Sequence, residues 1–346
     1  MNNYQAFLMQ ADEKSWLETL NQFLPDIHAV DRNAVQIWFR FHPLALLRFI
    51  ESAEDKAKTL HQSAMQGDFD LKDQIDSSHK FLYGHRYWKT VKEEIEKRAE
   101  SFSDSNANLK SEIEQIAKAV SEKAKAEKSL TLGISAIGLM TLLQAGFEAF
   151  KAAKGETEKP KGLMTKSPDQ IVTERAKDDS QGVFGFLKTI DKKFTVTWED
   201  KLSTGQFPLK NQAELATASA LDQTQNWKER DERCWEGVIP VECRSASCGT
   251  CWIGVIAGEE KLSDVQRLER KQMKIFGYNQ PDEAKPFMRL ACQAKAHGNV
   301  SIVIPSWNGV FGKKVYDNIE QLELEPVTTS AKKLRETISE ATENSK

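Results

Sequence analysis

The sequence predicts an α+β protein, with a mainly α-helical N-terminal region followed by a domain of short β-strands. Two observations support this prediction. In the first part of the chain, apolar residues recur at helical spacing among charged ones. After about residue 190, short alternating, β-branched segments bounded by turn residues replace that pattern. The length of 346 residues suits two domains.

Charge and cysteine content narrow the class of protein. The formal net charge of −3 is close to neutral for this length and gives no support for nucleic-acid binding. The start of the chain, Met1 to Trp16, has neither a basic segment nor an early apolar run and does not resemble a secretory signal. Five cysteines, an odd number, argue against a disulfide framework. We therefore expect a cytoplasmic protein with reduced thiols.

Residues 1–128 form the predicted helical region. An apolar, aromatic-rich stretch is interrupted at His42-Pro43, so two helices are expected to meet there. Further along lies an apolar stripe at spacings of four, three and four residues: Leu109, Ile113, Ile116 and Val120. Two interpretations stay open, a short coiled-coil seam or an ordinary amphipathic helix. Because the stripe is shorter than two heptads, the amphipathic helix is favoured.

Residues 129–150 form a predicted apolar helix. The stretch from Ser129 to Phe147 carries no formal charge and is near the length needed to cross a bilayer. It is poor in strongly apolar residues, and lysines flank both ends, which gives no orientation in a membrane. The helix is therefore either buried in the protein or associated with a membrane through residues 129–147.

The rest of the chain divides by composition. Residues 151–189 are polar and predict a linker, and residues 317–346 predict a charged tail. Residues 190–316 between them predict a β-rich domain. Its expected elements are a hairpin of Phe194–Trp198 with Gly205–Leu209, a short helix at Ala213–Leu221, and strands at Trp252–Ala257 and Val300–Ile304.

Four cysteines in this domain form one motif. Cys243, Cys248 and Cys251 follow the spacing C-x4-C-x2-C, and Cys292 comes after forty intervening residues. This is the plant-type arrangement for a [2Fe–2S] cluster. Structural zinc sites instead place their ligands as two close pairs. Five of the six residues between the first three cysteines are small, so backbone N–H groups can approach the sulfurs: Ser245, Ala246, Ser247, Gly249 and Thr250. The motif predicts a [2Fe–2S] cluster bound by all four cysteines.

Around these residues the chain resembles the plant-type [2Fe–2S] ferredoxin family. The resemblance covers about residues 190–312 and includes Ile239-Pro240 before the loop, Trp252–Gly258 after it and Arg289–Ala294 around the last cysteine. It implies a β-grasp fold and one-electron transfer. A short helix is expected to open at Leu262–Asp264, with Ser263 and Gln266 at capping-box spacing.

The sequence also departs from the family pattern. The family usually has Gly at the position of Ala246, so strain or a different turn is expected there. Two insertions are expected, at Gln223–Glu236 and around Lys274–Lys285. They leave the set of cysteines intact.

Other residues are assigned ordinary roles. Cys234, outside the motif, is expected to be a partly buried free thiol, and Trp252 a core residue. Arg244 is left open between a contact to the cluster or a partner and a solvent-facing position. Structural roles are also expected for the N-terminal histidines, with no second metal or haem site: His42, His61, His79 and His85. No nucleotide-binding or hydrolase motif is present.

We therefore expect one-electron transfer through a [2Fe–2S] cluster, by a tethered carrier or an electron-transfer subunit of a larger redox system. Residues 191–310 contain sixteen Lys and Arg and sixteen Asp and Glu, and so have no net charge. A free shuttle of the ferredoxin type is usually strongly acidic, so neutrality favours a tethered carrier. The alternatives are an electron-feeding component of a partner oxidoreductase or oxygenase, and a cluster-based redox sensor. The donor and acceptor are unidentified redox proteins, and any catalysis is expected in a partner.

Overall fold

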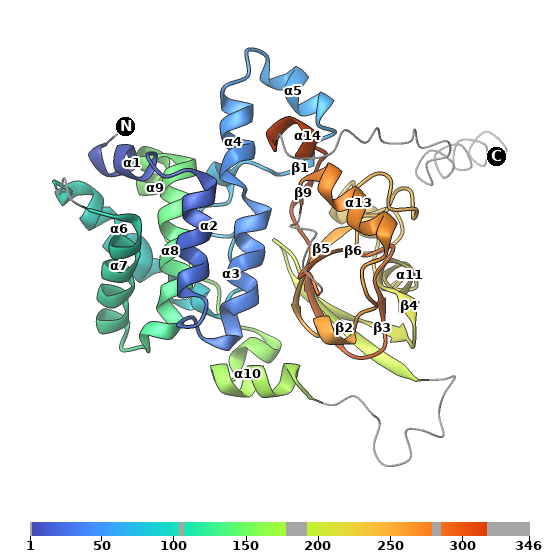
Figure 1. The fold of residues 1–346 in the computed structure, drawn as a ribbon. Helices are drawn as coiled ribbons and strands as arrows, with labels where there is room; N and C mark the ends of the chain where they lie inside the picture. The colour runs from blue at the N-terminus through green and yellow to red at the C-terminus, as the bar shows by residue number, and fades with distance from the viewer. Residues whose placement is uncertain (1, 104–106, 178–191, 279–284, 317–346) are drawn as a thin grey trace. The chain divides into compact units, whose positions relative to one another are not determined.

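The computed structural model describes residues 2–103, 107–177, 192–278 and 285–316. The chain forms two compact units, one of residues 1–52 with 69–174 and the other of residues 53–68 with 175–346. Helices build the first unit and a sheet with short helices builds the second, which confirms the predicted α+β class (Figure 1). The predicted charged tail, 317–346, lies outside the described residues.

In the helical unit, one helix ends and the next begins at the predicted junction. Helix α3 ends at Phe41 and α4 begins at Leu44, so the break at His42-Pro43 is confirmed. Its elements are α1 (Asn3–Leu8), α2 (Glu13–Phe23), α3 (Ala29–Phe41), α4 (Leu44–Glu51), η1 (Leu71–Asp73), η2 (Tyr83–Tyr87), α6 (Trp88–Ser101), α7 (Leu109–Ala124), α8 (Lys128–Ala145), α9 (Phe147–Ala152), η3 (Gly162–Thr165) and α10 (Pro168–Arg175).

Helix α7 carries the apolar stripe predicted from the sequence. Ile113, Ile116 and Val120 are buried, and α7 packs against α6 and α8 within the unit. Its opposite side is charged and exposed, with Lys118 and Glu122 on it. The amphipathic-helix interpretation is therefore confirmed.

Helix α8 is the centre of the helical unit. It contacts α1, α3, α6 and α7. Its glycines allow this close packing, because a Cβ at Gly133 would lie 2.5 Å from Val35 and one at Gly138 would lie 2.6 Å from Ile95. The helix ends at Gly146, which has φ +87°, so the apolar helix predicted at 129–150 is in fact two helices, α8 and α9.

The polar residues of α8 find partners inside the protein. The Thr131 hydroxyl donates to the Ala117 carbonyl at 2.9 Å, and the Gln144 amide donates to the His42 carbonyl at 2.9 Å. Among the described residues α8 is the one helix long and apolar enough to cross a membrane, but 89% of it is buried in the protein. This burial favours a core helix over a membrane span.

Part of the predicted linker is packed against the helical unit. Within residues 151–177 the chain forms η3 and α10, and Ile171 of α10 is fully buried. Ile171 packs with Val30, Tyr83 and Leu130. Leu163, Met164 and Val172 of the same segment pack against this cluster, so a few apolar side chains anchor a segment whose composition predicts a linker. The rest of that segment, from residue 178, lies outside the described residues.

Three histidines are buried in the helical unit. His42, His79 and His85 are at most 5% exposed, and Nδ1 of His79 lies 3.0 Å from Nδ1 of His85. Burial lowers the pKa of His42 to about 3 and the pKa of His85 to about 4, and it holds the pKa of His79 well below its usual value. All three are therefore neutral at pH 7, whereas His61 is exposed on α5 (Lys56–Gln62).

The buried histidines predict that acid destabilises the helical unit. Their pKa values are lower in the folded than in the unfolded state, so the unfolded state binds more protons once the pH falls below about 6.5. Stability present at neutral pH is then lost as the pH falls towards 4, by up to about 1.4 kcal/mol per pH unit for each buried histidine. We expect the urea midpoint followed by circular dichroism to fall between pH 7 and pH 5.

The control compares a buried and an exposed histidine. His42→Gln removes one titrating group and is expected to flatten the dependence of the urea midpoint on pH. His61→Gln is expected to keep the wild-type slope, because His61 is exposed. Equal slopes for the two variants would contradict the role assigned to burial.

The second unit contains a five-stranded mixed sheet in the order β3-β2-β8-β5-β6. Strand β2 is antiparallel to β3 and parallel to β8. The predicted hairpin is confirmed, since Phe194 pairs with Leu209 and Trp198 pairs with Gly205. The elements of this unit are α5 (Lys56–Gln62), β1 (Gln66–Gly67), β2 (Lys193–Glu199), β3 (Thr204–Lys210), β4 (Ala213–Glu214), α11 (Leu215–Ala220), α12 (Trp227–Arg230), β5 (Trp252–Ala257), η5 (Glu259–Lys261), α13 (Arg267–Phe276), β6 (Met288–Leu290), β7 (Lys295–Ala296), β8 (Val300–Val303), β9 (Trp307–Asn308) and α14 (Gly312–Val315).

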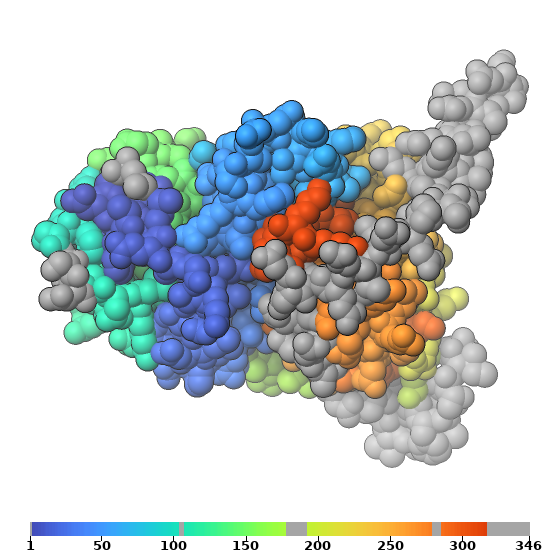
Figure 2. Space-filling view, turned by 45° about the horizontal axis from the view of Figure 1, so that its top comes forward, coloured from blue at the N-terminus to red at the C-terminus, as the bar shows by residue number. Residues whose placement is uncertain are grey.

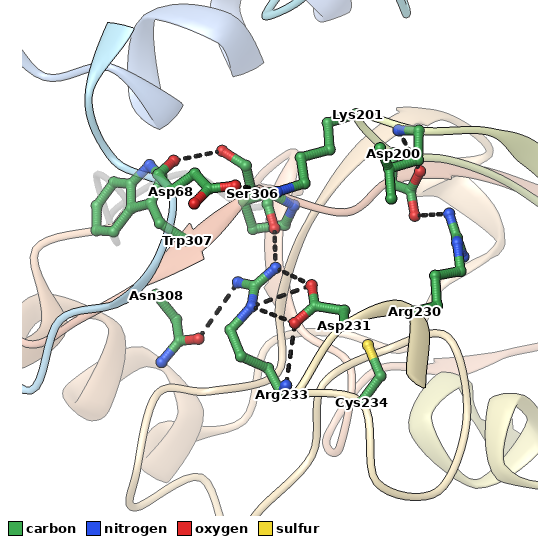
Figure 3. Close-up of polar contacts among 12 residues, drawn as sticks. Asp68, Asp200, Lys201, Arg230, Asp231, Arg233, Cys234, Ser306, Trp307 and Asn308 are labelled. Carbon is green, nitrogen blue, oxygen red and sulfur yellow. Dashed lines mark hydrogen bonds and ion pairs between the residues drawn. The ribbon is translucent and has the colours of Figure 1, made fainter. Parts of the chain in front are cut away.

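Residues 53–68 pack with this second unit, although the sequence places them in the helical region 1–128. Strand β1 pairs with β9, with Gly67 opposite Trp307. Asp68 and Ser306 exchange two hydrogen bonds, of 2.9 Å to the Ser306 carbonyl and 2.8 Å to the Asp68 carbonyl (Figure 3). Gly67 has φ +79°, and a Cβ there would lie 2.3 Å from the Ser306 carbonyl oxygen, so this pairing requires glycine.

The predicted insertion at Gln223–Glu236 is part of the folded domain. Arg233 within it is 5% exposed, forms an ion pair with Asp231 at 2.7 Å and donates to the Pro305 carbonyl at 3.1 Å. It also donates to Asn308 of β9 at 3.4 Å (Figure 3). Arg233 therefore ties the insertion to the segment that carries β9. A small pocket opens beside it, and its charged groups pair with one another: Arg230 with Asp200, and Arg233 with Asp231.

Candidate iron–sulfur site

The pairing of β5 with β6 brings the last two cysteines of the motif together. Cys251 immediately precedes β5, and Trp252 pairs with Leu290 of β6. In this register the Ala291 N–H donates to the Cys251 carbonyl at 2.8 Å, and Cys292 follows directly. An antiparallel ladder thus places two residues that are far apart in sequence side by side.

The four predicted cysteines form two hydrogen-bonded pairs that lie near each other. Cys243 bonds with Cys248, and Cys251 bonds with Cys292. The pairs also influence each other electrostatically, since Cys248 raises the pKa of Cys251. Cys251 and Cys292 are buried, whereas Cys243 and Cys248 are partly exposed.

Within each pair one thiol donates a hydrogen bond to the sulfur of the other. The hydrogen bond from Cys248 lowers the pKa of Cys243 to about 4, and the same bond, together with burial, raises the pKa of Cys248. The bond from Cys251 likewise lowers the pKa of Cys292, and that bond with burial raises the pKa of Cys251. Each pair thus contains one sulfur with a lowered pKa and one with a raised pKa, and both sulfurs must lose their protons when they bind a metal.

The small residues of the loop direct hydrogen-bond donors at the sulfurs, as their sizes predict. The Ser245 N–H donates to the Cys243 sulfur at 3.4 Å. The Ala246 N–H donates to the sulfur of Cys292, and the Thr250 N–H donates to the sulfur of Cys248. Such donors stabilise negative sulfur. The Gln293 side chain adds a further donor, 3.5 Å from the Cys292 sulfur.

Three loop residues adopt left-handed conformations: Arg244 with φ +57°, Ala246 with φ +58° and Gly249 with φ +74°. Gly249 packs on helix α13, because a Cβ there would lie 3.0 Å from the Phe276 ring. Ala246 is 1% exposed. The strain expected where the family has glycine is therefore present, since a left-handed conformation costs about 1–2 kcal/mol in a residue with a Cβ.

Position 246 is expected to tolerate glycine and reject a β-branched residue. Ala246→Gly relieves about 1 kcal/mol of strain but loses about 0.8 kcal/mol of methyl burial, so stability changes by less than about 1 kcal/mol. Ala246→Val crowds a left-handed position and is expected to speed cluster release at least tenfold. The decay of visible absorption in the presence of an iron chelator measures release, and equal decay in both variants would refute the assignment.

A buried ion pair holds the strand that delivers Cys292. Arg289 of β6 and Glu269 of α13 are at most 2% exposed and are joined by two bonds, of 2.9 and 3.0 Å. Glu269 also accepts from the Leu290 N–H at 3.1 Å, two residues before Cys292. This ion pair was not predicted from the sequence. Its signal is Arg289, a charge within an otherwise apolar segment.

The helix predicted to open at Leu262–Asp264 in fact begins at Arg267, and Gln266 makes no side-chain cap. Ser263 is used differently. Its N–H donates to the Lys295 carbonyl at 2.8 Å, and its hydroxyl accepts from the Lys295 N–H at 3.2 Å. Pairing with this neighbouring strand residue overrides the capping-box pattern.

An aromatic cluster lies behind the cysteine loop. Trp252 stacks on Tyr278 with ring centroids 3.9 Å apart and donates to the Trp307 carbonyl at 3.0 Å. Trp252 is 1% exposed, which confirms its core role. Burial raises the pKa of Tyr278, and Cys248 and Cys251 add to this shift. The aromatic rings therefore exclude water from the inner side of the site.

Arg244 and Cys234 have clear positions. Arg244 forms an ion pair with Glu236, donates to the Thr217 hydroxyl at 3.1 Å and accepts from Gln293 at its carbonyl. It thus joins the loop to α11 and to the insertion. Cys234 is 5% exposed, and burial raises its pKa to about 12. Its sulfur donates to the Val238 carbonyl at 3.1 Å, so it is an unreactive buried thiol.

Residues 220–297 match the family model of the 2Fe–2S iron-sulfur cluster binding domain. The matched segment contains all four cysteines of the motif. The C-terminal region is therefore a [2Fe–2S] cluster-binding domain of the ferredoxin type, with a general role in electron transfer. Comparisons with curated proteins and with solved structures found no match.

The residues at the site fit this cofactor. Two thiol pairs suit two irons, each of which needs two protein sulfurs. A structural zinc ion would instead draw four ligands to one centre. Among the described residues, no group of three or more His, Cys, Asp and Glu side chains is arranged around a single metal position. The donor set, its pairing and its amide donors therefore agree with a binuclear cluster.

Proposed function

We propose that this chain passes single electrons through a [2Fe–2S] cluster held by Cys243, Cys248, Cys251 and Cys292. The observation that supports this proposal is that the four thiols form two neighbouring pairs whose sulfurs accept hydrogen bonds from backbone N–H groups. When bound, a plant-type cluster supplies a one-electron centre at roughly −400 mV. The hairpin β2–β3, the helix α11 and the parallel pair β2–β8 suit the β-grasp fold proposed for this domain.

One side of the site is buried, and the other is partly exposed to solvent. Cys251 and Cys292 are buried beside the aromatic cluster, which lowers the local dielectric. Cys243 and Cys248 are partly exposed, and Ser245 between them is exposed. The loop therefore provides an accessible edge on one side and fixed N–H donors that stabilise added negative charge.

We propose a tethered carrier or complex subunit over a free shuttle, with donor and acceptor being redox proteins and any catalysis in a partner. Two features support this. The domain sequence 191–310 has no net charge, and the helical unit joins the cluster-binding unit at three places along the chain, next to residues 52, 68 and 174. We also propose a cytoplasmic location with α8 as a core helix. Release by high-salt washing supports it, whereas retention through carbonate washing supports a membrane span.

Visible absorption and low-temperature EPR test the proposed function on anaerobically purified protein. The expected result is a red-brown protein that gains a rhombic EPR signal after reduction with dithionite. A colourless protein that contains zinc, even after reconstitution with iron and sulfide, would refute electron transfer and leave a structural metal site.

A redox sensor is the second candidate, and one observation favours it. Residues 53–68 are flanked by the helical unit on both sides of the sequence but pair with β9 in the cluster-binding unit. Trp307 of β9 contacts Trp252, which follows Cys251, at a centroid distance of 5.1 Å. A sensor predicts that hydrogen exchange in residues 44–75 differs between the oxidised and reduced protein, whereas a simple carrier predicts no difference.

A further inference from the structure

Helix α13 presents a basic face. Its exposed or partly exposed cations lie within an arc of about 100° on the helix: Arg267, Arg270, Lys271 and Lys274. The only acidic residue in its sequence, Glu269, is fully buried in the ion pair with Arg289. The carboxylate of α13 is therefore engaged by Arg289 on the inner side of the helix.

The neighbouring helix extends this basic face. Helix α14 packs against α13 and exposes Lys313 and Lys314. It lies beside the blue segment that contains α5 (Figure 2). Lys314 donates to the Gln62 carbonyl at 2.7 Å. We call the six cations of α13 and α14 the α13–α14 face.

The charge of the domain is therefore unevenly distributed. Residues 191–310 have no net charge, yet the four cations of α13 belong to one helix face within that range. Cations gathered on one helix face orient an approaching acidic protein even where the net charge is zero.

The inner side of α13 packs on the cluster-binding loop. The Phe276 ring packs on Gly249, because a Cβ at Gly249 would lie 3.0 Å from this ring. In the sequence, Gly249 lies between two of the proposed cluster ligands. Tyr278, just beyond the helix, stacks on Trp252, which directly follows Cys251, with ring centroids 3.9 Å apart. Helix α13 thus has cations on its outer side and the cysteine loop on its inner side.

An exposed apolar residue lies on the same helix. Leu268, next to Arg267, is 49% exposed. Protein interfaces commonly combine a central apolar anchor with a rim of charged residues. A nucleic acid would use the cations but would gain little from the leucine.

We propose that the α13–α14 face is the docking surface for an acidic one-electron redox protein. The proposal rests on the proposed function and specifies it further, because it gives the sign of charge of the partner and the side of the domain on which it binds. The partner's carboxylates would face Arg267, Lys271 and Lys313, and an apolar patch would cover Leu268.

A titration with an acidic flavodoxin tests this proposal on the full chain with its cluster. The charge-reversing variant is Arg267→Glu with Lys271→Glu. Its matched control is Lys192→Glu with Lys210→Glu, the same change in charge at and before the β2–β3 hairpin. Calorimetry measures the dissociation constant with both proteins oxidised, and amide chemical shifts locate the contact.

The dissociation constant is expected to rise at least tenfold in the α13 variant and to change less than twofold in the control. Added salt is expected to weaken wild-type binding more than that of the α13 variant. The amide shifts are expected to cluster on α13 and α14.

Three results would overturn the proposal. Equal affinities for the α13 variant and its control would exclude this face. Dissociation of a dimer by the α13 variant, without weaker flavodoxin binding, would assign the face to a second copy of the chain. Charge-dependent binding of a DNA duplex without flavodoxin binding would assign it to nucleic acid. Failure of the proposed function would be seen separately, as absence of the EPR signal in the wild-type protein.

Discussion

Cys251→Ser is expected to abolish stable cluster binding. Cys251 is 3% exposed, its carbonyl accepts from the Ala291 N–H, and its sulfur bonds with Cys292. Serine keeps the size of the side chain but replaces a soft thiolate ligand with a hard and weakly acidic hydroxyl. Iron per chain and visible absorption are both expected to fall at least tenfold, and Cys292→Ser is expected to do the same.

The chain provides its own control for this experiment. Cys234 is also buried, at 5% exposed, but its sulfur bonds to the Val238 carbonyl and not to the four cysteines of the motif. Cys234→Ser is expected to keep the full iron content and the EPR signal of the wild type. Loss of the cluster in Cys234→Ser, or full iron content in Cys251→Ser, would contradict the assignment of the ligands.

The ligand set could be predicted from sequence because it depends on spacing. Three cysteines within nine residues must lie on one loop, and the small residues between them leave room only for backbone donors. The hairpin at Phe194–Leu209 and the strand at Trp252–Ala257 were predictable for a similar reason, since alternation and β-branching are local signals. The strain at Ala246 followed from one non-glycine residue in that loop.

Features that depend on distant pairing could not be predicted in this way. Residues 53–68 have ordinary helical and polar composition, yet their partner is β9, more than 200 residues later in the sequence. Ser263 and Gln266 have capping-box spacing, but Ser263 pairs with Lys295 instead. In both cases a contact between distant residues outweighs a local preference, and no single stretch of sequence contains that information.

The burial of α8 could be predicted only in part from the sequence. Its length and composition allow either a membrane span or a core helix. Gly133 and Gly138 are what distinguish them in the structure, because they let α3 and α6 approach within van der Waals contact. Small residues also occur where membrane helices pack, so the sequence alone leaves both interpretations open.

Glu269→Gln is expected to destabilise the cluster-binding unit strongly, although Glu269 lies outside the ligand set. The substitution keeps the shape of the side chain but leaves the Arg289 guanidinium buried with its counter-charge removed. Breaking a buried ion pair on one side costs about 3–5 kcal/mol. Because Glu269 also accepts from the Leu290 N–H, the segment that delivers Cys292 is expected to loosen, and the cluster to be released faster.

A double variant that removes both charges separates the cost of an unpaired buried charge from the effect of lost packing. In the double variant Glu269→Gln with Arg289→Met no unpaired charge stays buried, so at least half of the lost stability is expected to return. Urea unfolding followed by circular dichroism measures stability, and the decay of visible absorption in chelator measures cluster release. If the two substitutions were instead additive in both measurements, the ion pair would not be what positions the Cys292 segment. A restored stability with persistently fast release would show that the hydrogen bond to the Leu290 N–H, and not the charge pairing, holds this ligand in place.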